Sequence, residues 1–296
     1  MIFFGRCSTG LRRRLRSLDD PSVPAFGLDT GPRVLSLDYD QASGSRTPRV
    51  GPMTSHTSKD ERGRERRTAR AAGAWYLGLA ITGIAGFLLI RPAVYDPDDA
   101  ATTLKNLTTD EGLARLGLGV ELAIVVTQAL AAVWFYKLFR PLNAVAAWSV
   151  GVFGMVNAVA ILASSAAVAT ALEVSRGSGL APGGDAAATT QLLFRLSESF
   201  WGVGNLFFGL WLIPMGWVAV TSVRFPRALG WILIAGGVGY IASAFVEYAF
   251  DAPTWLGDAL TTPATIGEFW MIGYLLVIGV RPAAERPSRA HAEAAA

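Results

Sequence analysis

Four carboxylates interrupt stretches of the sequence that are otherwise almost purely apolar: Glu121, Glu198, Glu247 and Glu268. An ionisable side chain at the centre of an apolar helix costs about 2.5–3.5 kcal/mol on membrane-insertion scales, so each glutamate needs a physical explanation. Clustered carboxylates raise one another's pKa and attract positive charge. Their chemistry is therefore that of a site for a cation, a proton or a basic ligand.

Amide side chains accompany two of these glutamates at a helical spacing. Gln128 follows Glu121 by seven residues, and Asn205 follows Glu198 by seven, a separation that returns a helix to nearly the same face. We expect the four glutamates and both amides to border one polar cavity that faces the outside. Two basic residues expected near the same depth are the candidate counter-charges, Arg115 and Arg195.

Three functions are compatible with these residues. The first is a non-enzymatic membrane protein that binds or moves a small ligand, cation or proton through the acidic cavity. The second is a structural or partner-binding membrane protein without a ligand, in which the glutamates stay hydrated near the headgroups or pair with Arg195 and order the bundle. The third, an enzyme acting on lipid by acid–base chemistry, is least favoured because the sequence lacks a complete catalytic set.

Cysteine and histidine usage argues against a metal or cofactor. Cys7 is the single cysteine, which excludes an intrachain disulfide and a cysteine-based zinc or iron–sulfur site. The two histidines, His56 and His291, lie in polar tails, so no imidazole is available at membrane depth. A phosphate-binding Gly-Lys-Ser/Thr loop, a Gly-x-Ser-x-Gly elbow and a His-Glu-x-x-His pair are also missing. We predict neither enzyme activity nor a cofactor.

The apolar stretches themselves predict the fold. The sequence is 52% hydrophobic and 17% charged, and residues 71–90 and 141–172 contain no charged side chain. About 20 apolar residues in a helix cross the hydrocarbon core of a bilayer. The sequence therefore predicts an all-α, polytopic transmembrane bundle with six spans, at 72–90, 116–136, 142–172, 196–220, 228–250 and 265–280.

The regions outside the spans have a different composition. Residues 1–67 are polar and basic, without a sustained helical period, and we predict that they form a disordered tail. Met53 begins a more ordinary start, so the residues before it are hypothesised to be upstream sequence. Residues 68–282 form the predicted membrane domain, and 283–296 a disordered cytoplasmic tail.

Lysine and arginine are distributed unevenly between the two sides of the predicted bundle. Thirteen lie beside the spans on the side of the termini, and five lie on the other side. Because basic residues concentrate in cytoplasmic segments, both termini are predicted to be inside. This topology explains the net charge of +3 better than a nucleic-acid partner does. The predicted partner is the lipid bilayer, and a small ligand or protein partner is left open.

Several short motifs resemble a known family. They are RAAG at 70–73, RPL at 140–142, FFGL at 207–210, FPRALGW at 225–231, GVGY at 237–240 and GE at 267–268. Across residues 68–282 the sequence resembles domain-of-unknown-function family 4386, uncharacterised bacterial membrane proteins with six predicted spans. The resemblance implies a multi-pass protein of a bacterial plasma membrane. It transfers no activity, because the family has none assigned.

Overall fold

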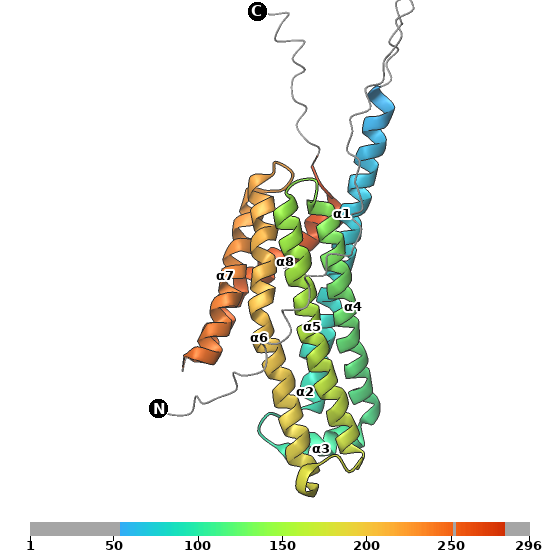
Figure 1. Cartoon of the computed structure of the whole chain (residues 1–296), viewed down its shortest axis with the longest axis vertical. Helices are drawn as coiled ribbons and strands as arrows, with labels where there is room; N and C mark the ends of the chain where they lie inside the picture. The colour runs from blue at the N-terminus through green and yellow to red at the C-terminus, as the bar shows by residue number, and fades with distance from the viewer. Residues whose placement is uncertain (1–53, 251–252, 282–296) are drawn as a thin grey trace, which may run out of the picture. The chain divides into compact units, whose positions relative to one another are not determined.

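The part of the chain described by the computed structural model, residues 54–250 and 253–281, is mostly helical and contains no strand. The all-α prediction is therefore confirmed. The helices in chain order (Figure 1) are α1 (Thr54–Ile84), the π-helical η1 (Ala85–Ile90), α2 (Arg91–Val94), α3 (Ala100–Thr109), α4 (Glu111–Phe139), α5 (Ala144–Ser175), the short 3₁₀ turn η2 (Pro182–Gly184), α6 (Ala186–Thr221), α7 (Arg227–Ala249) and α8 (Thr254–Val277).

Five helical segments are long and apolar enough to cross a membrane. They are Asp60–Val94, which joins α1, η1 and α2, together with α4, α5, α6 and α7. At about 1.5 Å per residue each exceeds the 30 Å of a hydrocarbon core. The chain is thus a multi-pass membrane protein. The 24-residue α8 is not among the five, and its first half carries Asp258 and a Thr261-Thr262 pair.

Helix α1 begins earlier than the sequence predicts. It is continuous from Thr54, so residues 54–67 are helical where disorder is predicted. The second half of this stretch is rich in Arg and Glu, which are good helix formers, and it extends a span that already supplies the costly helix nucleus. The predicted disorder of 1–53 and 283–296 and the hypothesis about Met53 lie outside the described residues.

Helix α8 also begins before its predicted start at residue 265, and it runs through Pro263. A proline inside a helix removes one backbone hydrogen bond, which usually requires support from a neighbouring helix. Here α7 provides close packing, because Gly236 lies against the backbone of Ala264 and Gly239 lies against the carbonyl of Leu260. The helix therefore persists through the proline.

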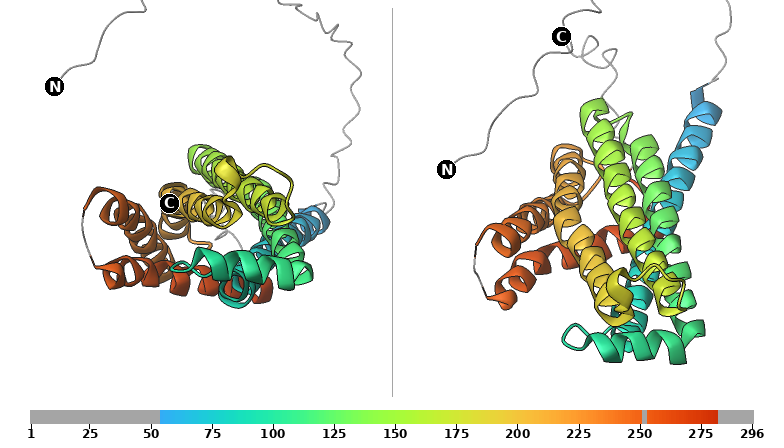
Figure 2. Two further views of the ribbon diagram at one scale, coloured as in Figure 1. Left: turned by 90° about the horizontal axis from the view of Figure 1, so that it is seen from below. Right: turned by 60° about the horizontal axis from the view of Figure 1, so that its bottom comes forward.

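The long helices pack as neighbours in chain order. Helices α4, α5, α6 and α7 lie side by side with alternating direction, and α8 packs obliquely between α7 and α1 (Figures 1 and 2). The larger of the two apolar cores contains an aromatic cluster of Tyr76, Phe135 and Trp211, whose ring centroids are 5.3–5.7 Å apart. These contacts join α1, α4 and α6 inside the bundle.

Helix α3 lies across one end of the bundle (Figure 2). It begins at Asp99, whose carboxylate accepts hydrogen bonds from Thr102 and from the backbone N–H of Ala101. Those bonds, chiefly the one from the Thr102 hydroxyl, hold the pKa of Asp99 below its ordinary value. The buried face of α3 contributes Leu107 to a smaller apolar core with Val94 of α2. This second core closes one end of the bundle and lines the small pocket described below.

Candidate functional site

Glu121 is the most buried of the four predicted glutamates, with 7% of its surface exposed. Its Oε1 accepts a 2.5 Å hydrogen bond from the Ser164 hydroxyl of α5 and a 3.0 Å bond from the Trp201 indole of α6. A carboxylate of α4 therefore joins three helices. Two neutral donors on one oxygen offset part of the cost of removing this group from water.

A chain of two hydroxyl groups connects Glu121 to Arg91. Both terminal nitrogens of Arg91 donate to Ser197 Oγ at 3.2 Å, and Ser197 Oγ lies 2.7 Å from Ser164 Oγ. A hydroxyl has a single proton. Because Ser164 gives its proton to Glu121, Ser197 is the donor to Ser164. The hydrogen bonds consequently point in one direction, from the guanidinium to the carboxylate.

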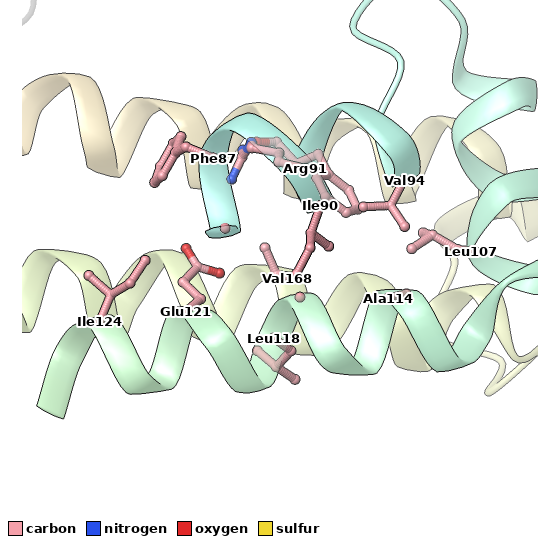
Figure 3. Close-up of a pocket in the computed structure, with 13 residues that line it drawn as sticks. Phe87, Ile90, Arg91, Val94, Leu107, Ala114, Leu118, Glu121, Ile124 and Val168 are labelled. Atoms are coloured by element: carbon pink, nitrogen blue, oxygen red, sulfur yellow. The ribbon is translucent and has the colours of Figure 1, made fainter. Parts of the chain in front are cut away.

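Arg91 and Glu121 face the same small pocket (Figure 3). Its volume is about 40 Å³, and the remaining lining is apolar. Three aromatic rings surround the guanidinium at 5.6–5.8 Å, those of Phe87, Tyr95 and Phe194. Arg91 is not among the predicted site residues, because Arg91-Pro92 marks the end of a predicted span. The available signal was the apolar pair Val94-Tyr95 shortly after it, and both of these side chains are buried.

The two predicted counter-charges have different partners. Arg195 Nη1 pairs with Glu198 at 3.3 Å, and Tyr95 donates to the same Oε2 of Glu198 at 3.1 Å. Burial, together with the charge of Glu198, raises the pKa of Tyr95 to about 12, so its hydroxyl remains a donor at neutral pH. Arg115 instead pairs with Glu111 at 2.8 Å, a residue outside the predicted set.

Gln128 lies on the buried face of α4 that also carries Glu121. It is fully buried, and its amide nitrogen donates to the backbone carbonyl of Gly154 at 3.3 Å. Within the described part of the chain, its Oε1 has no hydrogen-bond partner, and neither has the equally buried amide nitrogen of Asn157. The centre of the α4–α5 contact therefore contains buried polar atoms that do not take part in hydrogen bonds between the described residues.

Glu268 lines a larger cavity at the centre of the bundle. The cavity measures about 250 Å³ and has lining residues from α1, η1, α4, α5, α6, α7 and α8. Six of the fourteen lining residues are aromatic, namely Tyr76, Phe87, Trp201, Phe208, Tyr240 and Phe269. Tyr76 donates to Glu268 Oε1 at 2.5 Å. In the part of the chain that is described, this is the one hydrogen bond that the carboxylate accepts.

Glu247 and Asn205 line a third cavity, of about 430 Å³, beside the end of α7 and the start of α8. Its lining also includes Asp258, so two carboxylates face the same space. Tyr240 lines both this cavity and the central one. The two cavities are therefore neighbours, with the Tyr240 ring at their boundary.

The four predicted glutamates thus lie in four different settings. Glu121, Glu268 and Glu247 line three separate cavities, and Glu198 pairs with Arg195. One shared cavity was expected because their positions along the helices are similar. The oblique path of α8 separates them, since it carries Glu268 to the bundle centre. Among the described residues, no group of three or more His, Cys, Asp or Glu could hold a metal ion.

Comparison with known proteins places the chain in a family. The model of a domain of unknown function (DUF4386) matches residues 71–279, which is more than two thirds of the chain and includes Glu121, Glu247 and Glu268. No curated protein and no solved structure matches the chain. The match agrees with the motifs between Arg70 and Glu268. The chain therefore belongs to the DUF4386 family of domains of unknown function.

Proposed function

We propose that this protein binds and moves a small organic cation through its central cavity, with Glu268 as the residue that recognises the positive charge. The observation that carries the proposal is a cavity lined by six aromatic rings and a single carboxylate. Aromatic faces attract cations, and one carboxylate in an apolar pocket fixes a charged group in place. A hydrophobic ammonium ion fits both requirements.

The ionised Glu268 carboxylate is stabilised when it binds a cation. An ionised carboxylate has about four lone-pair sites, and the Tyr76 hydroxyl occupies one. A charge left unpaired at membrane depth is costly, so the group gains when it binds either a proton or a cation. Glu121 differs, because two donors and the hydroxyl chain from Arg91 already stabilise it.

The third cavity supplies a route to the central one. Glu247 and Asp258 give it negative charge, which concentrates cations at its mouth. Glu268 follows Asp258 by ten residues in the same helix, which is about 15 Å along the axis. Tyr240 separates the two spaces. We therefore assign the outer cavity to cation entry and the Tyr240 ring to the barrier that a cation passes.

The same proposal includes six spans in a bacterial plasma membrane, with both termini cytoplasmic. Support for the sixth comes from α8, which is about 36 Å long. It begins beside the end of α7, and Gly279, just beyond its other end, lies against Arg66 of α1. The excess of lysine and arginine on the side of the termini supports the orientation.

A matched pair of probes tests the proposal. Phenethylammonium and 2-phenylethanol have nearly the same shape and differ in charge. We expect isothermal calorimetry of the full chain in nanodiscs to give at least about tenfold tighter binding of the ammonium ion, because a charge-assisted contact contributes about 1.5–3 kcal/mol. Glu268→Gln should remove this preference. Binding should also weaken as the pH falls, since protons compete for the carboxylate.

Glu173→Gln is the matched control, because Glu173 is an exposed glutamate of α5. It should bind both probes as the unaltered protein does. If the Glu268→Gln protein folds and still prefers phenethylammonium, the assignment of Glu268 as the cation-binding residue is wrong.

The alternative is a structural or partner-binding membrane protein in which the glutamates order the bundle. The bonding of Glu121, which joins α4 to α5 and α6, favours this role for that residue. If all of the glutamates have this structural role, Glu121→Gln and Glu268→Gln will both lower the free energy of unfolding in detergent. Neither probe will then show saturable binding to any variant.

A further inference from the structure

A separate cavity of about 170 Å³ lies at the end of the bundle where the α4–α5 and α6–α7 turns meet α1. Three basic side chains from three parts of the chain line it: Arg64 of α1, Lys137 of α4 and Arg224 of the α6–α7 turn. We infer that this cavity binds the phosphate of an anionic phospholipid headgroup. The inference does not depend on the Glu268 site.

The charges at this cavity are not balanced within the described part of the protein. Arg224 forms a two-point ion pair with Glu65, at 2.7 and 3.2 Å, which uses the one carboxylate in the lining. Neither Arg64 nor Lys137 pairs with a carboxylate of the described residues. Lys137 Nζ instead lies 4.6 Å above the Trp134 ring. Two positive charges consequently remain for an anion.

Arg224 is held rigidly enough to form a site. Its side chain is 15% exposed, and its backbone carbonyl accepts a 2.8 Å bond from the Tyr274 hydroxyl and a 3.3 Å bond from the backbone N–H of Arg281. Residues of α1, of α8 and of the chain after α8 therefore hold Arg224 in place at one wall of the cavity. This fixed wall reduces the number of groups that must become ordered when Arg64 and Lys137 bind an anion.

The position and lining favour a lipid over a free anion. Exposed tryptophans occur near this end of α5, α6 and α7, at Trp148, Trp217 and Trp231, as expected at the interface between hydrocarbon and headgroups. The cavity lies at the helix ends beyond these rings. The rest of its lining is largely apolar, with Leu138, Pro141, Leu142 and Val280. A phosphate joined to glycerol and acyl chains matches this combination.

Native mass spectrometry of the full chain in detergent tests the inference, with phosphatidylglycerol and phosphatidylcholine as the probes. We expect one preferentially retained phosphatidylglycerol. The double variant Arg64→Gln/Lys137→Gln should weaken its apparent affinity about thirtyfold, the usual effect of two basic residues at a membrane surface. Both side chains are exposed, so the fold should survive. Arg64→Lys/Lys137→Arg keeps both charges and should retain the lipid.

A charge-matched control removes two basic residues at the opposite end of the bundle, Lys105→Gln/Arg115→Gln. An equal loss of phosphatidylglycerol in this control would show that net charge alone attracts the lipid, and it would overturn the site. Competition by millimolar inorganic phosphate that removes the lipid completely would also overturn it, because the cavity would then be a site for a soluble anion.

Discussion

At the scale of residues, the hydroxyl chain explains how two opposite charges are tolerated near the same pocket without direct contact. Arg91 donates hydrogen bonds to Ser197, Ser197 donates to Ser164, and Ser164 donates to Glu121. Each hydroxyl both accepts and donates, which makes the bonds mutually reinforcing. Removal of one member leaves its neighbours with unsatisfied polar groups, and that loss is more costly than the bond itself.

We predict that Ser164→Ala and Ser197→Ala each lower the free energy of unfolding by about 1–3 kcal/mol. The double variant should lose less than the sum of both, with a coupling energy of about 0.5–3 kcal/mol, because either substitution already breaks the chain. Unfolding by sodium dodecyl sulfate in mixed micelles measures these differences. Ser149→Ala is the control, since the Ser149 hydroxyl makes an exposed bond within its own helix. Strictly additive losses would rule out a connected chain.

The residues of the site were predictable to different degrees. The seven-residue spacing of Glu121 and Gln128 indicates one helix face, and both side chains are buried on α4. The partners of each glutamate were not predictable, because spacing gives depth and face but not the rotation of one helix against another. Arg91 was assigned to the end of a span for a local reason, the proline that follows it. In α2, Val94 is buried because it packs in the same apolar core as Leu107 of α3, and this tertiary contact cannot be read from the local sequence.

At the scale of elements, glycine brings α6 and α7 together. Gly216 lies against Gly230, and Gly209 lies against Gly237, so backbone meets backbone at two points one period of seven apart. A Cβ at Gly216 would be 2.5 Å from the carbonyl oxygen of Gly230, well inside van der Waals contact. These paired glycines therefore form a close helix contact of the kind typical of membrane proteins.

Gly216→Ala is expected to lower the free energy of unfolding by about 1–3 kcal/mol, the usual cost of overpacking, because the added methyl group pushes α7 away from α6. Gly119→Ala is the matched control. A Cβ at Gly119 of α4 meets nothing within 4 Å, so alanine there should be neutral or slightly stabilising. Thermal unfolding in detergent gives both values. Equal melting temperatures for the two variants would contradict the close α6–α7 contact.

The positions of the helices were largely predictable, and the exceptions have physical causes. Apolar length alone locates α4, α5 and α7. Helix α8 starts before its predicted position because glycines of α7 stabilise the turn around Pro263. Such support between helices is a tertiary effect, and it cannot be predicted from the apolar residues of one helix alone.

At the scale of the whole molecule, the distribution of lysine and arginine predicts which ends of the helices face the cytoplasm. The α6–α7 turn carries Arg224, and Arg227 follows it at the start of α7, whereas the α5–α6 connection carries one basic residue, Arg176, and the acidic Asp185. Basic residues resist translocation across the membrane, so the α6–α7 turn should be inside and the α5–α6 connection outside. If α8 crosses as well, the residue that follows it returns to the inside.

Single cysteines in a Cys7→Ser background test this topology, since Cys7 is the sole native cysteine. On intact cells a membrane-impermeant maleimide should label Ser178→Cys of the α5–α6 connection, and it should label Val223→Cys and Arg281→Cys only after lysis. All three positions are exposed, so burial does not explain a difference between them. Labelling of Arg281→Cys on intact cells, with Val223→Cys protected, would mean that α8 does not cross. The central cavity would then open from one side only, and a cation bound at Glu268 could not be carried through.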